Sequence, residues 1–343
     1  MPARPVDPTR RRLLAASLGG SAMAAVGATW PAVQAFADDM EHFIKGPAVP
    51  DIAPQQLSEH VWMIWSRDGF PTPENQGMMC NVTFAITRKG VVMLDPGGSL
   101  QIGEMVIRQI RKLTDKPVVA IFNSHYHGDH WLANHAFVDA YGADLPIHAH
   151  PHTAREIAGV QGNLWRSLME RWTNQATAGT RIVAPNRTVE RGAEFDFGDV
   201  TLRVHHYGVA HTPGDICLQV VEDNLTYVGD VAMDRRIANM DDGSYPGTFR
   251  TYDALEANAR SAIWVPGHGH AGPGVLDWNR ELFAGIWENC VQAVEEGLPM
   301  DVAREMVVKD PRVAGKAADT AGFDGNIGKY VSLAYLEAEK EAF

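Results

Sequence analysis

The feature that most constrains this chain is the string HYHGDH, which places His125, His127, Asp129 and His130 within six residues. It follows the apolar run 118–122, which is typical of a buried strand. Side chains two residues apart in an extended chain point the same way, so His125 and His127 can bind one metal ion. Asp129 and His130 follow where the chain turns towards a predicted helix, and they can face a second ion. A loop rich in histidine by chance would explain neither arrangement.

Three later segments each supply one further candidate ligand. His211 stands in the string VAHTPGD, whose Pro-Gly pair predicts a tight turn at a strand end. Asp230 ends the strand-like run 225–229, and His268 follows the apolar run 262–266. These strand ends are expected to form one rim of a sheet together with the HYHGDH string. Neutral imidazoles with carboxylates suit zinc, and they fit iron or manganese less selectively.

In this chain order, the ligands resemble those of the metallo-β-lactamase fold superfamily, with a glyoxalase II-like set. The resemblance covers roughly residue 57 to the C-terminus. It implies two Zn²⁺ ions, with Fe or Mn as alternatives. His125, His127 and His211 would hold the first ion, and Asp129, His130 and His268 would hold the second. The Asp230 carboxylate would bridge the two ions. The string DPGG after the run 91–94 also matches. Its Asp95 is therefore expected to accept a hydrogen bond from a metal-bound histidine and to orient that ring.

Two groups of strand-like segments predict two sheets. The first group comprises 61–65, 81–87, 91–94 and 118–122, and the second comprises 188–190, 194–197, 200–207, 215–221 and 225–229. Apolar residues at helical spacing, or helix-forming composition, mark 101–113, 131–141, 278–296, 301–308 and 326–342. The expected fold is α/β, an αββα sandwich in which two mixed sheets lie face to face with helices outside.

The first 37 residues are interpreted as a twin-arginine signal peptide and not as part of the fold. Arg10, Arg11 and Arg12 resemble the twin-arginine motif, and a run rich in Ala and Gly leads to the small-residue site Ala35-Phe36-Ala37. An uncleaved anchor is disfavoured because the run 13–29 is short. We therefore expect a periplasmic protein with a single catalytic domain over 38–343, with C-terminal helices and without a stable membrane anchor after cleavage.

Charge and cysteine content restrict the partners. A formal net charge of -12 at pH 7 argues against nucleic acid and anionic membrane surfaces, so a small-molecule substrate is expected. Cys80, Cys217 and Cys290 occupy none of the candidate ligand positions, and one disulfide among them is left open. Cys80 and Cys217 lie in apolar strands and are expected to be buried.

The segment 231–250 lies between two candidate ligands, so we expect it to border the site. Arg235 and Arg236 are candidates for holding an anionic group of a substrate, although a solvated loop explains them equally well. Asn239 and Tyr245 are further candidates for substrate binding. Earlier in the chain, large apolar residues between 164 and 172 have helical spacing, which predicts either core or an apolar wall at the mouth of the site.

The expected function is that of an exported dinuclear zinc hydrolase. Hydroxide shared by two ions and oriented by Asp129 would attack the carbonyl of an ester, lactone, thioester or amide. β-Lactamase activity is an alternative, although the commonest zinc β-lactamases have a cysteine at the place of Asp230. A mono-iron persulfide dioxygenase is another alternative, because such proteins share the scaffold but use two histidines and one aspartate. A third is a non-catalytic accessory protein of a redox relay. Short likenesses at 242–244 and 335–339 resemble the periplasmic zinc metallohydrolase branch associated with sulfur oxidation and quinoprotein systems.

Overall fold

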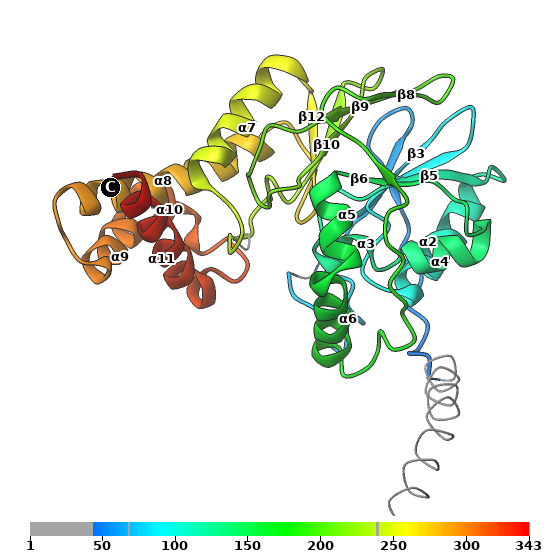
Figure 1. The fold of residues 1–343 in the computed structure, drawn as a ribbon, viewed down its shortest axis with the longest axis horizontal. Helices are drawn as coiled ribbons and strands as arrows, with labels where there is room; N and C mark the ends of the chain where they lie inside the picture. The colour runs from blue at the N-terminus through cyan, green and yellow to red at the C-terminus, as the bar shows by residue number, and fades with distance from the viewer. Residues whose placement is uncertain (1–43, 68, 238–239, 343) are drawn as a thin grey trace, which may run out of the picture. The chain divides into compact units, whose positions relative to one another are not determined.

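Two mixed sheets form the centre of the computed structural model (Figure 1). In the first sheet the strands follow chain order, antiparallel from β1 to β4 and parallel from β4 to β7. Its strands are β1 (Gln55–Gln56), β2 (Val61–Ile64), β3 (Val82–Ile86), β4 (Val91–Leu94), β5 (Val118–Phe122), β6 (Ile147–Ala149) and β7 (Arg187–Thr188). The second sheet has the order β12-β11-β10-β9-β8, with β11 and β12 parallel and the other pairs antiparallel. Its strands are β8 (Glu194–Asp196), β9 (Thr201–His205), β10 (Cys217–Val220), β11 (Leu225–Gly229) and β12 (Ile263–Pro266).

The sheets pack against each other through apolar side chains on their facing surfaces. Leu94 of β4 and Phe122 of β5 share one buried cluster with Leu218 of β10, Tyr227 of β11 and Val265 of β12. Burial of side chains of this size contributes about 2 kcal/mol each, so the inner layer is a main source of stability. It also fixes the strand ends of one sheet relative to those of the other.

Helices cover the outer faces. α2 (Leu100–Leu113) and α4 (Asn134–Tyr141) pack on the first sheet, where Ile102, Val106 and Ile110 are buried in one cluster with Phe84 of β3. The Ser99 side chain caps α2, because its Oγ accepts a hydrogen bond from the Ile102 N–H at 3.1 Å. α7 (Tyr245–Asn258) and the start of α8 (Val275–Glu295) pack on the second sheet. This order of layers confirms the predicted αββα sandwich.

The remaining helices border the site or form the C-terminal bundle. α3 (Gly128–Trp131), α5 (Pro151–Ala158) and α6 (Val160–Trp172) follow the HYHGDH string. α8, α9 (Met300–Lys309), α10 (Pro311–Ala317) and α11 (Phe323–Ala342) bury one shared apolar cluster.

The helix predictions were wrong in three places. The helix predicted over 131–141 is divided into α3 and α4, and α10 was not predicted. α7 was also missed, because its apolar residues are interrupted by Gly247 and two threonines that blur the helical period. A cap starts α7 nevertheless: the Ser244 Oγ accepts a hydrogen bond from the Gly247 N–H at 3.0 Å, and Pro246 stands in the first turn.

The structure describes residues 44–67, 69–237 and 240–342, and Gly46–Phe343 forms one unit. The predicted signal peptide and Asn239 lie outside the described residues. In the described part of the chain, none of the helices combines the length and the apolar character that crossing a membrane requires.

Candidate metal centre

Seven candidate ligands lie at one edge of the sandwich, where β5 of the first sheet and β11 and β12 of the second sheet end, and not at the rim of a single sheet as expected. His125 and His127 stand in the turn after β5, and Asp129 and His130 lie in the short helix α3. The other three are His211 in the loop before β10, Asp230 directly after β11 and His268 after β12. All seven side chains are buried. The structure thus brings together every residue that the sequence indicated as a metal ligand.

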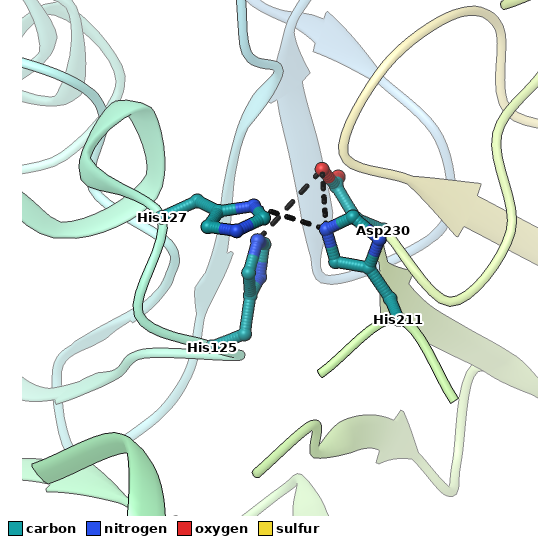
Figure 2. Close-up of side chains that lie close together, drawn as sticks. All are labelled: His125, His127, His211 and Asp230. Carbon is teal, nitrogen blue, oxygen red and sulfur yellow. Dashed lines mark hydrogen bonds and ion pairs between the residues drawn. The ribbon is translucent and has the colours of Figure 1, made fainter. Parts of the chain in front are cut away.

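A first cluster consists of His125, His127, His211 and Asp230, whose ligand atoms all lie within 4.8 Å of one another. Figure 2 shows the three imidazoles and the carboxylate pointing toward one another, with His125 and His127 on one loop and His211 and Asp230 on others. The Nε2 atom of His211 is 3.0 Å from Nδ1 of His127. Three nitrogens and one oxygen in this arrangement are a set that zinc accepts.

A second cluster lies beside the first and contains Asp129, His130 and His268. The Oδ2 atom of Asp129 is 3.5 Å from Nε2 of His130 and 3.2 Å from Nε2 of His268. His130, His268 and Asp230 also form a group whose ligand atoms lie within 4.8 Å of one another. The second cluster therefore offers two nitrogens and the oxygens of two carboxylates.

Asp230 faces both clusters. Its Oδ2 is 3.8 Å from Nε2 of His125, 3.6 Å from Nε2 of His211 and 3.4 Å from Nε2 of His268. Its Oδ1 is 3.3 Å from Nε2 of His130. One carboxylate in contact with both sets of imidazoles has the placement that a bridging ligand requires.

The Asp95 carboxylate orients one histidine of each cluster through hydrogen bonds. Its Oδ2 accepts hydrogen bonds from Nδ1 of His130 at 2.8 Å, from Oγ of Ser124 at 2.5 Å and from the Tyr227 hydroxyl at 2.7 Å. Because Oγ of Ser124 lies 2.9 Å from Nδ1 of His125, Asp95 also orients that ring through the serine. The bond from His130 to Asp95 and the bond from His125 to Ser124 hold a proton on Nδ1, so Nε2 of each ring faces the centre. Asp95 was predicted for this position, whereas Ser124 and Tyr227 were missed.

A backbone carbonyl and an amide side chain fix the loop that carries His268. The Met79 carbonyl lies 2.6 Å from Nδ1 of His268 and accepts its proton, which leaves Nε2 free for the centre. Asn81 binds the same loop from the first sheet, since its Nδ2 donates to the carbonyls of Pro266 at 3.0 Å and Gly269 at 2.8 Å. The Asn81 N–H also donates to the Gly267 carbonyl at 2.7 Å. This clamp joins the two sheets directly beside the clusters, and sequence reasoning did not find it.

The three imidazoles of the first cluster are neutral. Burial and the neighbouring imidazoles of His130 and His127 hold the pKa of His125 well below its usual value. Burial lowers the pKa of His127 to about 4, and burial together with His127 lowers the pKa of His211 to about 3. All three imidazoles are therefore unprotonated at pH 7, the form that binds metal ions.

The second cluster is charged. Burial acts to lower the pKa of His130, but nearby negative groups raise it well above its usual value. The Asp230 and Asp129 carboxylates are responsible, because burial raises the pKa of the Cys80 thiol to about 12 and keeps that group neutral. Burial acts to raise the pKa of both carboxylates, yet the imidazoles of His130 and His268 lower both. Without a metal ion, a protonated His130 balances these carboxylates.

The donor atoms fit bound cations. His125 Nε2, His130 Nε2 and Asp230 Oδ1 are buried and have no hydrogen-bond partner among the described residues. Leaving such atoms unsatisfied costs about 1–3 kcal/mol each, and they face one shared space. A divalent cation in each cluster would satisfy them and would offset the negative charge of Asp129 and Asp230.

Gly267 leaves the room that the clusters need. A Cβ atom at this position would lie 2.3 Å from Oδ1 of Asp230 and 2.6 Å from Cε1 of His130. Any larger residue would therefore displace two candidate ligands.

Cys80 lies behind the second cluster. Its Sγ is 3.4 Å from Nδ1 of His130 and contacts the Asn81 carbonyl at 3.1 Å. Its Sγ also lies within 4.8 Å of a carboxylate oxygen of Asp129, so the thiol stands at the edge of the second cluster, on the Nδ1 side of His130. All three cysteines are free and buried.

The four predicted substrate-binding residues have different positions. The Arg236 guanidinium contacts Nδ1 of His268 and lines a cavity beside the clusters. Arg235 is largely exposed, and its Nε lies 4.0 Å from Oδ1 of Asp234. The prediction for Tyr245 was wrong: this side chain is buried in the helical bundle against Phe283, where its aromatic ring packs with apolar neighbours. Asn239 lies outside the described residues.

Comparisons with known proteins agree with this architecture. The profile of the Metallo-beta-lactamase superfamily matches residues 75–304. A curated relative, the linear primary-alkylsulfatase of Pseudomonas sp. (strain ATCC 19151), is 24% identical in an alignment of 286 residues that covers 72% of this chain and 53% of the relative. The chain thus spans about half the length of that relative.

Solved structures show a similar fold. A metallo-beta-lactamase from Pontibacter korlensis superposes with a TM-score of 0.54 at 19% identity, over 67% of this chain and 97% of that one. The DIM-1 metallo-beta-lactamase exposed to ceftazidime gives a TM-score of 0.53 at 15% identity, over 69% and 98% of the two chains. At such identities the likeness shows the fold alone.

Proposed function

Because the chain belongs to the metallo-beta-lactamase superfamily, we propose that it is a metal-dependent hydrolase with two zinc ions, acting on an ester, lactone, thioester or amide. The observation that carries this proposal is the pair of buried clusters that share Asp230. Seven buried ligands exceed what a closed structural zinc site uses, which is four. The surplus supports a catalytic centre over a structural one.

The metal ions supply Lewis acidity and lower the pKa of a bound water. The residues of the chain then have separate tasks. Asp230 holds the two clusters at a fixed separation, and the Asp95 carboxylate keeps the protons of His130 and Ser124 directed away from the centre. Asp129 would accept a hydrogen bond from the attacking water and orient it, because its pKa is lowered and its Oδ2 lies among the donor atoms of the second cluster, 3.5 Å from Nε2 of His130 and 3.2 Å from Nε2 of His268.

The first test is the metal content per chain of protein purified after its own export route, determined by elemental mass spectrometry. We expect about two zinc ions, and hydrolysis of at least one member of a panel of thioesters, lactones, esters and β-lactams. About one iron with little zinc would contradict this proposal. It would favour an oxygen-activating enzyme of the persulfide dioxygenase kind, to be assayed by oxygen consumption.

A sulfate ester is a second candidate substrate. The support for it is the likeness to the curated relative that is named a linear primary-alkylsulfatase. The panel therefore includes alkyl sulfates, with sulfate release as the measurement. If the protein released sulfate from alkyl sulfates but hydrolysed no carbonyl compound, sulfate esters would replace the acyl compounds as the proposed substrates.

We further propose that the protein is exported to the periplasm and is released from its signal after Ala37. The support is the arginine string at 10–12 and the small residues at 35–37. The expected partner is a small molecule. N-terminal sequencing of the mature protein and its location after cell fractionation test this proposal.

A further inference from the structure

A cavity of about 350 Å³ lies beside the ligand clusters. Its walls come from the loop at Phe70, from α6 through Trp165 and Trp172, and from α11 through Tyr330. It borders the centre on two sides. The Trp165 ring lies 4.7 Å from the ring of His127, and the Arg236 guanidinium contacts His268. A molecule in this cavity therefore lies next to both clusters.

The lining of the cavity is apolar and aromatic with a positive charge. None of the described residues that line it has a carboxylate group. Arg236 and Lys329 are the two cationic residues among the described residues of the lining. The guanidinium carbon of Arg236 lies 5.2 Å from the centre of the Phe70 ring, and the Nε of Arg236 is buried without a hydrogen-bond partner among the described residues. The other cation, Lys329, is already bound to Oδ2 of Asp241 at 2.6 Å.

Arg236 is therefore the group that an incoming anion would meet. No described carboxylate pairs with it, and a partly buried guanidinium without an anionic partner is costly. Its contact with Nδ1 of His268 brings two hydrogen-bond donors together, which makes no favourable bond. An anion with oxygen atoms would satisfy the guanidinium and would be held a few atoms from the second cluster.

An apolar stripe on α6 continues from this cavity. Val160, Leu164, Leu168 and Trp172 are spaced four residues apart and so lie on one face of the helix. Val160 is 80% exposed, Leu164 46% and Trp172 39%. Because Trp172 also lines the cavity, the stripe and the cavity form one continuous apolar surface.

We propose that this surface binds an anionic amphiphile: a substrate whose apolar chain lies against α6 and α11, and whose negative charge, at or beside the cleaved bond, is held by Arg236. This inference rests on the proposed hydrolase function and names its substrate class. The positive charge of Arg236 favours an anionic group, and the aromatic walls and the exposed stripe on α6 favour an apolar hydrocarbon chain.

Binding of non-hydrolysable amphiphiles to the full, metal-loaded chain tests the proposal. Butane-, octane- and dodecanesulfonate are titrated below their micelle concentrations and followed by tryptophan fluorescence and calorimetry. We expect affinity to rise by up to about fourfold for each buried methylene group. The 1-alkanols of equal length should bind at least about tenfold more weakly, because they lack the charge. Equal affinity across the series, or equal affinity of alkanol and sulfonate, would overturn the proposal.

Paired variants separate the two parts of the surface. Arg236→Gln should weaken sulfonate binding at least about tenfold and leave alkanol binding unchanged, whereas Arg235→Gln, at the exposed neighbour, should change neither. Trp172→Ala should reduce the dependence on chain length, while Val308→Ala, at an exposed apolar position on α9 outside the cavity lining, should not. If Arg236→Gln and Arg235→Gln bind alike, the anion is not held by Arg236 and the proposal fails.

The metal content and the hydrolysis panel are measured on the same samples. Hydrolysis of short neutral esters without sulfonate binding would overturn the amphiphile and leave the hydrolase intact. Sulfonate binding without hydrolysis of any panel member would overturn the hydrolase, and with it the assignment of the amphiphile as substrate. Hydrolysis of dodecyl sulfate would place the anion in the cleaved bond, whereas hydrolysis of only carboxylate-bearing esters would place it beside that bond.

Discussion

Each half of the ligand set takes two residues from the segment after β5, and the halves share one carboxylate, yet their charges differ. In the first half, burial keeps His125, His127 and His211 neutral. In the second, the carboxylates raise the pKa of His130 well above its usual value. The first half is thus ready to bind a cation without losing a proton, whereas the second must release the proton of His130 first. Two adjacent sites built from similar residues are therefore expected to fill in order and with different pH dependence.

The largest effect on metal content and activity is expected at Asp230, which the two halves share. Asp230→Asn removes the carboxylate that faces both, so we expect metal content to fall below one ion per chain and hydrolysis to drop by more than about 100-fold. Asp234→Asn is the matched control, because that carboxylate contacts the exposed His270. Elemental analysis and hydrolysis rates measure both variants. Two ions retained by Asp230→Asn would mean that the halves do not depend on a shared ligand.

A comparison of His211→Asn with His268→Asn separates the halves. Loss of His211 removes one of three neutral nitrogens, and we expect the tighter ion to be lost together with nearly all activity. Loss of His268 should remove one ion and leave the other, with activity lowered about 100-fold. Metal content after dialysis against a weak chelator measures the difference. The order of filling proposed here would be wrong if His268→Asn lost both ions and His211→Asn only one.

The supporting residues should affect the halves unequally. Asp95→Asn weakens the direct bond to His130 and the bond through Ser124, so metal affinity should fall about 10–100-fold in both halves. Ser124→Ala leaves the bond to His130 intact and should lower the affinity of the first half alone. Competition titrations with a chromophoric chelator resolve the two affinities. If Asp95→Asn and Ser124→Ala lost metal affinity equally, Asp95 would not support the second half.

The metal-free protein should lose stability in acid because of the first half. The pKa of His211 is about 3 in the folded chain and near 6.5 when unfolded, so only the unfolded chain takes up a proton between these values. The free energy of unfolding should therefore fall as pH decreases below about 6.5, by about 2 kcal/mol per such histidine at pH 5. His130 behaves oppositely: its contribution is complete below pH 6.5 and is lost as pH rises through its raised pKa.

Urea unfolding of the metal-free protein, prepared with a chelator, measures the difference in the free energy of unfolding between pH 7 and pH 5. His211→Gln should reduce the pH dependence, whereas His152→Gln, at a partly exposed histidine outside both halves, should not. A metal-free protein that is equally stable at both pH values would contradict the neutral state assigned to the first half.

The smallest effect is expected behind the second half. Cys80→Ala removes a thiol that borders Nδ1 of His130 at the edge of the second cluster. Stability should change by about 1 kcal/mol or less, and the metal content should stay the same. Cys217→Ala, at a buried cysteine of β10, is the matched control for a small core substitution. Loss of an ion in Cys80→Ala alone would make this cysteine a ligand.

The residues that bind metal were predictable because metal binding demands a local pattern. His125, His127, Asp129 and His130 are close in sequence, and strand periodicity identified the strand ends that carry Asp230 and His268. Strand alternation and helical spacing also predicted both sheets and most helices, but they assigned 188–190 to the second sheet, whereas β7 pairs with β6 in the first. These patterns arise because a half-buried strand or helix has its apolar residues on the buried face.

The parts that were missed depend on contacts between distant segments. Asn81 reaches the Gly267 loop across the two sheets, and Tyr227 reaches Asp95 across the inner layer. Neither position has a local signal, because an amide or a phenol in a strand is compatible with many surroundings. Tyr330 of α11 shows the same difficulty. Its side chain lines the cavity through the packing of the C-terminal helices, which periodicity cannot place relative to the sheets.

Gly267 has a consequence for how such a chain can change over evolutionary time. Every point mutation of its codon that changes the amino acid adds at least one carbon atom where Asp230 and His130 need the space. Such a mutation would disturb the centre in a single step. The walls that α6 and α11 supply contain no candidate ligand, and Val160, Leu164 and Trp172 are open to solvent. A lineage could therefore explore new substrates by drift in these helices while the reactive centre stays intact, and innovation would be concentrated in the helical walls and not in the strand ends.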